Sequence, residues 1–142
     1  MLIAEILKDK GGAVFTAAPA DDLNSTAQAL DEKRVGALVI CEGDRVVGIL
    51  SERDLVRAVA RHGQIALARP VADYMTQDVI FAEPTETVTI LMERMTDRRI
   101  RHLPVLDKGR LVGVVSIGDL VKSKIAEATF EAESMKAYIG AG

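Results

Sequence analysis

The stretch Val47-Gly48-Ile49-Leu50-Ser51-Glu52-Arg53-Asp54-Leu55 returns 65 residues later as Val112-Gly113-Val114-Val115-Ser116-Ile117-Gly118-Asp119-Leu120. The agreement extends outward without a gap, from residues 14–57 onto 79–122, and 12 of these 44 aligned positions are identical. Two copies are too few for a solenoid, which needs three or more stacked units. We therefore expect two repeats that pack face to face about a pseudo-twofold axis, with ligand-binding clefts between them.

Composition limits the class of protein. The chain has 142 residues, of which 49% are hydrophobic, enough for one compact domain or two half-domains with a shared core. Its net charge of −3 argues against a general binder of nucleic acid or acidic membranes. No apolar run is long enough to span a bilayer, and the N-terminus lacks the basic and apolar regions of a signal peptide. The single Cys41 excludes an internal disulfide framework. We therefore expect a soluble, cytoplasmic protein.

Each repeat predicts the same order of elements, strand–helix–strand–strand–helix. An extended stretch ends in a proline, at Pro19 and again at Pro84. An amphipathic helix follows, with the apolar residues of 88–95 on one face in the second copy. Two β-branched runs then flank a glycine-containing turn, and a second helix begins near Ser51 and near Ser116. The predicted fold class is α/β (α+β), with two β-α-β-β-α repeats.

We divide the chain into an N-terminal helical segment (1–13), a first repeat (14–63), a linker (64–78), a second repeat (79–126) and a C-terminal helix extension (127–142). The last helix is longer than its counterpart and carries an apolar seam spaced like that of a coiled coil. The seam consists of Val121, Ile125, Ala128, Ala132, Met135 and Ile139. It can pack on the N-terminal segment or on a second subunit. We favour the second alternative, a homodimer.

Each repeat also carries the pattern Gly-x-x-Ser-x-x-Asp where its last helix begins, with Ser51 and Asp54 in one copy and Ser116 and Asp119 in the other. A serine followed three residues later by an acid, ahead of an apolar run, is a capping box. The same helix start presents free backbone N–H groups and a positive dipole end, which suit a phosphate or a ribose. A carboxylate in that first turn can accept hydrogen bonds from both ribose hydroxyls. The structural and the functional interpretation are compatible.

A basic cluster lies between residues 94 and 102 of this otherwise acidic chain. Such a cluster is often only a solvated helix end. Arg101 and His102, however, open a predicted strand and correspond to Gly36 and Ala37 in the first repeat. Across a pseudo-twofold axis this asymmetry places donors for phosphate oxygens beside one or both clefts.

Signatures of catalysis are missing from the sequence. It contains no Gly-x-Gly-x-x-Gly, no P-loop and no His-Glu-x-x-His. No group of acidic and histidine residues has metal-ligand spacing, and only His62 and His102 could serve as an imidazole base. We therefore expect no enzyme, no catalytic cofactor and no metal.

The repeat resembles a tandem pair of CBS (cystathionine β-synthase) domains, a stand-alone Bateman module, from Leu2 to about Ala126. Its most specific parts are the two stretches quoted above and Ile100-Arg101-His102-Leu103-Pro104-Val105. The resemblance implies a regulatory module of signal transduction that binds an adenine nucleotide (AMP, ATP or NAD) and often forms a disk-shaped homodimer. The alternative is a constitutive assembly module whose clefts bind nothing. The physiological nucleotide and the downstream partner protein stay open.

The resemblance also implies positions in each cleft. The serine–aspartate pairs would contact ribose, the two strand starts would line the adenine and phosphate regions, and the stretches before the prolines would wall the base. The implied set is Thr16, Ala18, Val35, Gly36, Ala37, Ile49, Ser51, Arg53, Asp54, Ala82, Ile100, Arg101, His102, Val114, Ser116, Gly118 and Asp119.

Two departures from the family pattern rank the clefts. Glu83 replaces the small residue usual before the proline, where it would either hinder the cleft it faces or alter the base preference. Gly36 and Ala37 supply no cation. We expect the cleft with Asp119 and Gly36 to be the better site, and the cleft with Asp54 and Glu83 the weaker one.

Overall fold

The structure, a computed structural model, describes residues 1–11 and 13–141. The first repeat consists of β1 (Thr16–Ala17), α2 (Leu23–Lys33), β2 (Ala37–Glu42), β3 (Arg45–Ser51) and α3 (Glu52–His62). The second repeat consists of α4 (Val88–Arg98), β4 (His102–Asp107), β5 (Arg110–Ser116) and α5 (Ile117–Ala141). Both hairpins have the same register, Ala37 opposite Ser51 and His102 opposite Ser116. The predicted α+β class and the two repeats are confirmed.

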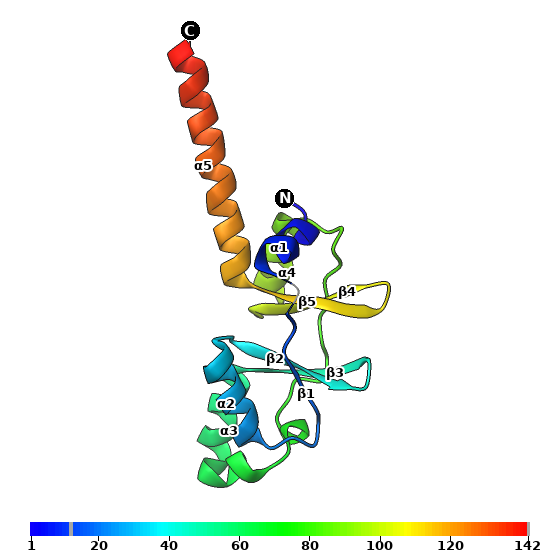
Figure 1. Ribbon diagram of the computed structural model, residues 1–142. Coiled ribbons are helices and arrows are strands. Elements are labelled where there is room, and N and C mark those ends of the chain that lie inside the picture. The colour runs from blue at the N-terminus through cyan, green and yellow to red at the C-terminus, as the bar shows by residue number, and fades with distance from the viewer. Residues whose placement is uncertain (12, 142) are drawn as a thin grey trace.

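The two sheets face each other across the middle of the molecule, with α2 and α3 outside one sheet and α1 (Ile3–Lys10) and α4 outside the other (Figure 1). In the first sheet β1 runs parallel to β2, and β2 runs antiparallel to β3. The second sheet has only β4 and β5, because its first segment pairs through the single bridge Ala82–Val105. The predicted opening strand is therefore reduced to one residue in the second repeat.

Equivalent caps define the first helix of each repeat. Asp22 accepts a hydrogen bond from the Ser25 backbone N–H at 2.7 Å, and Thr87 accepts one from Ile90 at 3.3 Å. Both helices end at an arginine in the left-handed conformation, Arg34 with φ 53° and Arg99 with φ 54°. This turn reverses the chain into β2 and β4 and leaves an arginine at the same place in each repeat.

Each hydrophobic core is completed by a segment from outside its own repeat. Ile3 and Ile6 of α1 are buried in the core of the second repeat, beside Leu91 and Leu103. Complete burial of Ile3 alone stabilises the fold by ~1.5–3 kcal/mol. The 3₁₀ helices of the linker, η1 (Gly63–Ala68) and η2 (Val71–Asp73), bury Ala66 and Val71 in the core of the first repeat. The order of segments in the chain therefore differs from their order in space.

Helix α5 projects away from the body of the molecule over much of its length (Figure 1). Its first half contacts the chain terminus, because the Met1 ammonium lies 2.7 Å from Glu127 Oε1 and Met1 Sδ lies 3.0 Å from Ser123 Oγ. The N-terminal segment therefore contacts α5 only as far as Glu127, and residues 128–140 are all exposed. No helix within the described ranges has the length and apolar character needed to cross a membrane.

Two clefts between the repeats as the candidate functional site

The larger cleft, the Asp54 cleft, has a volume of about 520 Å³ and lies where the two repeats meet. The first repeat contributes Gly36, Ile49, Ser51, Glu52, Arg53, Asp54 and Arg57 to its lining. The linker and the second repeat contribute Thr76, Asp78, Val79, Ile80, Arg98, Arg99, Ile100, Arg101, His102 and Pro104. A ligand in this cleft would therefore touch both repeats at once.

Ser51 and Asp54 hold each other where β3 becomes α3. The Asp54 backbone N–H donates to Ser51 Oγ at 3.3 Å, and the Ser51 N–H donates to Asp54 Oδ2 at 2.9 Å, so the predicted capping box is present. The other oxygen, Oδ1, lies 3.5 Å from the Thr76 hydroxyl. No cation of the described residues forms an ion pair with Asp54. The carboxylate therefore keeps acceptor capacity for the hydroxyl groups of a ligand.

One side of the Asp54 cleft is apolar. Ile49, Val79, Ile80 and Ile100 line it, and each is half-buried. The linker is tied to β3 at this place, because Ile49 exchanges two backbone hydrogen bonds with Thr76, at 3.0 and 2.9 Å. These hydrogen bonds hold the linker against β3 and so fix the position of an apolar slot, of the kind that accepts a flat aromatic group.

The opposite side of the cleft is cationic. Its arginines are Arg53, Arg57, Arg98, Arg99 and Arg101, all of them exposed. In the part of the chain that the structure describes, none of them is in ion-pair contact with a carboxylate. Arg53 reaches across the repeat boundary, where its Nη1 donates to the Arg99 carbonyl at 3.4 Å. Planar guanidinium groups without acidic partners are suited to phosphate oxygens.

Gly36 and His102 meet between the repeats and line both clefts. A Cβ atom on Gly36 would lie 2.8 Å from His102 Nε2, closer than side chains tolerate, so only glycine makes room for the imidazole. Burial lowers the pKa of His102, although the nearby Glu52 carboxylate opposes the shift. The imidazole is therefore neutral near pH 7 and offers hydrogen bonding more than charge.

The smaller cleft, the Asp119 cleft, has a volume of about 300 Å³. Its lining consists of Leu7, Lys10, Gly11, Ala13, Phe15, Arg34, Val35, Gly36, Ala37, His102, Val114, Ser116 and Asp119. The Ser116 N–H donates to Asp119 Oδ2 at 2.8 Å, and the Asp119 N–H donates to Ser116 Oγ at 3.1 Å. The serine–aspartate cap of this cleft thus repeats that of the Asp54 cleft.

The aspartate of this second cleft already has a cationic partner. Lys10 Nζ lies 2.8 Å from Asp119 Oδ2 and donates to the Val114 carbonyl, also at 2.8 Å. Burial by itself would raise the pKa of Asp119, but hydrogen bonds from Lys10 and Ser116 and the charge of Lys10 outweigh it, so the pKa is lowered. Asp119 is therefore a carboxylate that is bound internally.

Comparison with known proteins identifies the repeats. The family described as CBS domain matches residues 5–61 and 71–125. The chain belongs to the CBS-domain family.

Solved structures support this assignment over the whole pair. A CBS-domain containing protein from Agrobacterium tumefaciens is 39% identical with a TM-score of 0.85, over 87% of this chain and 99% of that one. The CBS domain pair of protein MJ0100, solved with 5′-methylthioadenosine and S-adenosyl-L-methionine, is 26% identical with a TM-score of 0.79, over 89% and 98%. A CBS domain protein from Pyrobaculum aerophilum, complexed with AMP, is 30% identical with a TM-score of 0.75, over 84% and 89%.

The structure distributes the predicted site residues over the two clefts of the CBS pair. Ile49, Ser51, Arg53, Asp54, Ile100 and Arg101 line the Asp54 cleft. Val35, Ala37, Val114, Ser116 and Asp119 line the Asp119 cleft, and Gly36 and His102 line both.

Four predicted residues, Thr16, Ala18, Ala82 and Gly118, line neither cleft. This part of the chain runs alongside the sheets, where Thr16 pairs with β2 and Ala82 is buried against β4. The contact of Thr16, Ala18 and Ala82 with a bound base stays a prediction. Gly118 lies exposed in the first turn of α5.

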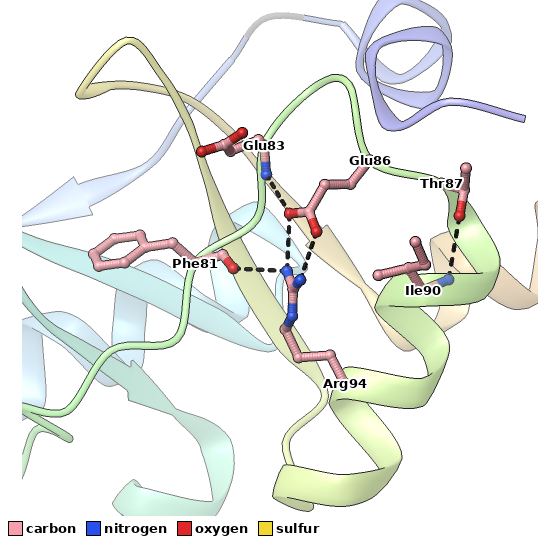
Figure 2. Close-up of polar contacts among 6 residues, drawn as sticks. All are labelled: Phe81, Glu83, Glu86, Thr87, Ile90 and Arg94. Atoms are coloured by element: carbon pink, nitrogen blue, oxygen red, sulfur yellow. Dashed lines mark hydrogen bonds and ion pairs between the residues drawn. The ribbon is translucent and has the colours of Figure 1, made fainter.

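Glu83 lies outside both clefts, so the reason for ranking the Asp54 cleft second does not hold. Figure 2 shows the cluster to which it belongs: the Glu83 backbone N–H donates to Glu86 Oε1 at 2.9 Å, while its own carboxylate is directed away. Arg94 forms a two-pronged pair with Glu86 and donates to the Phe81 carbonyl at 3.0 Å. Arg94 of the basic cluster is therefore a structural residue.

Residues 79–80 at the start of the second repeat, and α1, form cleft walls that the sequence patterns did not indicate. Val79 and Ile80 line the Asp54 cleft, whereas the base wall was predicted a few residues later. The apolar pair at 79–80, aligned with Val14 and Phe15, was the available signal. Lys10 offered no signal, because it is one of two lysines in an amphipathic helix.

Proposed function

We propose that this CBS pair is a regulatory module that binds an adenine nucleotide, of the AMP, ATP or NAD type, in the Asp54 cleft. The observation that carries the proposal is the combination in one cleft of a carboxylate without a cationic partner, an apolar slot and five arginines without acidic partners. Each of these features matches one part of the ligand.

The ribose belongs beside Asp54. The two neighbouring ribose hydroxyls are hydrogen-bond donors. To accept from them, Asp54 Oδ1 needs to lose only its 3.5 Å contact with the Thr76 hydroxyl. The adenine ring fits the slot between Ile49, Ile80 and Ile100, which are half-buried and exclude water from its faces. Burial of a flat apolar surface supplies affinity, and the hydroxyl contacts orient the ligand.

The phosphates belong beside Arg101 and Arg99, with Arg53 supplied from the other repeat. The relatives solved with AMP, and with two adenosine compounds that lack phosphate, support adenosine as the shared element. More arginines line the cleft than a single phosphate needs, which supports a ligand with at least one phosphate and room for more.

The proposed role is regulatory. A bound nucleotide would bridge the two repeats, and a ligand that prefers one arrangement of them shifts the population toward it. We assign no catalytic step to the cleft, and we interpret the 3.1 Å hydrogen bond from the Ser51 hydroxyl to the Asp54 carboxylate as part of the helix cap. A cytoplasmic location and a downstream partner protein stay predictions.

The test uses ligand-free protein and thermal melts with millimolar adenosine, AMP, ATP and NAD. A ligand at about one hundred times its Kd raises the free energy of unfolding by ~2.7 kcal/mol, which moves Tm by several degrees. We expect such a shift with the nucleotides and a smaller one with adenosine. Unchanged curves with all four compounds would support the alternative, a constitutive assembly module whose clefts bind nothing.

We further propose that the module is a homodimer and that α5 contributes to it. Ile125, Met135 and Ile139 of its seam are 61%, 66% and 71% exposed, an apolar stripe that a monomer leaves in water. In the heptad defined by this seam, Glu131 and Lys136 flank it at g and e positions. A parallel second copy places these opposite charges next to each other.

Sedimentation tests the dimer. We expect the full chain at twice 15.3 kDa, with Met135→Glu lowering the dimer affinity and Ser134→Glu, beside the seam, leaving it unchanged. Since CBS pairs have other exposed helix faces, a partial loss agrees with the proposal. A monomer at micromolar concentration would overturn it, as would an affinity that Met135→Glu leaves unaltered.

A further inference from the structure

We infer that Lys10 is a built-in occupant of the Asp119 cleft, so that each chain has one nucleotide site that is open and one that its own N-terminal helix closes. This inference rests on the proposed function of the Asp54 cleft. In this inference, Lys10 determines how many nucleotides each chain binds.

The first step is the position of the ammonium group. It contacts Asp119 Oδ2 and the Val114 carbonyl, each at 2.8 Å. Asp119 corresponds to Asp54, and Val114 corresponds to Ile49. Lys10 therefore stands in front of the carboxylate to which a ribose would donate.

The second step is the contrast with the other cleft. There the Ile49 carbonyl accepts the backbone N–H of Thr76 at 2.9 Å, so no side chain is needed to satisfy it. Met75 takes the place of Leu7, because the two side chains pack over the equivalent glycines Gly48 and Gly113. Thr76 takes the place of Lys10, and its hydroxyl lies 3.5 Å from Asp54 Oδ1. Thr76 brings no charge, and the carboxylate of Asp54 stays available.

The third step is the strength of the obstacle. The ammonium contacts Asp119 Oδ2, the oxygen that also accepts the Ser116 N–H. The obstacle to a ribose is therefore the positive charge and the side chain that Lys10 brings into the lining of this cleft, beside the carboxylate. The Asp119 side chain is 24% exposed and the Lys10 side chain 41%, so water screens the pair only in part. The lowered pKa of Asp119 agrees with a carboxylate held by a cation.

The fourth step is the anchoring of the lysine. Helix α1 is fixed to the second repeat, because Ile3 is buried and the Ile3 and Ala4 N–H groups donate to the Glu86 and Pro84 carbonyls at 2.9 Å. Leu7 fills the space over Gly113, where a Cβ would lie 2.5 Å from Leu7 Cδ2. The ammonium is therefore delivered by a docked helix, and opening the cleft requires moving or replacing Lys10.

The experiment is calorimetric titration of full-length protein with AMP, in which the number of sites per chain is the readout. Lys10→Met removes the ammonium and keeps an unbranched side chain of similar length. We expect one site in the wild type and two in Lys10→Met, and Asp119→Ala added to Lys10→Met should return the number to one. Lys8→Met, in the same helix and exposed, is the matched control and should keep one site.

The difference in site number between Lys10→Met and wild type decides the inference separately from the proposed function. A wild type without any site overturns the Asp54 proposal, yet a single site gained in Lys10→Met would still support the occupant. A wild type with two sites overturns the inference, as does a cooperatively folding Lys10→Met with no added site.

Discussion

The Asp54 cleft and the Asp119 cleft are built from equivalent strands, turns and capped helices, and they differ in what the preceding segment brings to them. The linker brings Thr76 to the first cleft and leaves its aspartate without a cation. Helix α1 brings Lys10 to the second cleft, where it pairs with the aspartate at 2.8 Å. A repeat can thus preserve the scaffold of two sites while the segments between its copies decide which site is open.

The largest expected effect comes from removing each aspartate in turn. Asp54→Ala should weaken the binding of adenosine and AMP alike by about 1.5–3 kcal/mol, because the carboxylate contacts the ribose and not the phosphate. Asp119→Ala should leave the affinity near that of wild type. Calorimetry with both ligands measures this difference.

The two variants also differ in stability. Each removes the acid of a capping box, which should lower the free energy of unfolding by ~1 kcal/mol, and Asp119→Ala should lose up to ~1 kcal/mol more because it also removes the ion pair with Lys10. The comparison breaks if Asp119→Ala loses more affinity than Asp54→Ala, since the Asp119 cleft would then be the working site.

A smaller effect is expected at the cationic side of the Asp54 cleft. Arg101→Ala should reduce the affinity for AMP about tenfold, or ~1.4 kcal/mol, and leave adenosine almost unchanged. The loss should shrink as salt is added, because the residue is exposed and its charge is screened. Arg110→Ala, at the far end of the same hairpin, is the control and should bind both ligands as wild type does.

A substitution of His102, measured in the same titration, tests how much hydrogen bonding contributes to AMP affinity compared with charge. Because burial lowers its pKa, His102→Ala should reduce AMP affinity less than Arg101→Ala at pH 7. If the ratio of AMP affinity to adenosine affinity is the same in wild type and in both variants, Arg101 and His102 do not contact the phosphate, and we would assign that role to Arg53 or Arg99.

The smallest effect concerns the pH dependence of stability. Asp119 has a pKa below its ordinary value of 3.8 in the folded protein, so its ion pair stabilises the fold above that pH. This contribution is lost as the pH falls through the lowered pKa. Urea unfolding should show Lys10→Met less stable than wild type by up to ~1 kcal/mol at pH 7, and the difference should vanish in acid. A difference that persists unchanged at low pH would assign the effect to packing instead of charge.

The order of elements could be read from the chain, because it depends on short-range patterns. The 65-residue identity of the repeats, the apolar face of α4 and the serine–aspartate caps at Ser51 and Ser116 are local features, and local hydrogen bonds realise them. The strand starts at Gly36 and Arg101 were predicted beside a cleft for the same reason, since each follows a helix and opens a strand.

Tertiary structure decided which side chains meet. Lys10 and Asp119 are 109 positions apart in the chain, and nothing in the pattern around either residue predicts their contact. Val79 and Ile80 line a cleft because the linker pairs with β3 through Thr76 and Ile49. Such contacts depend on how α1 docks onto the second repeat, from which it is distant in sequence, and on how the linker folds back onto the first repeat. That docking is fixed by the burial of Ile3, Ile6, Ala66 and Val71. Sequence by itself therefore determined two equivalent scaffolds, and only long-range packing made one carboxylate available and gave the other an internal cation.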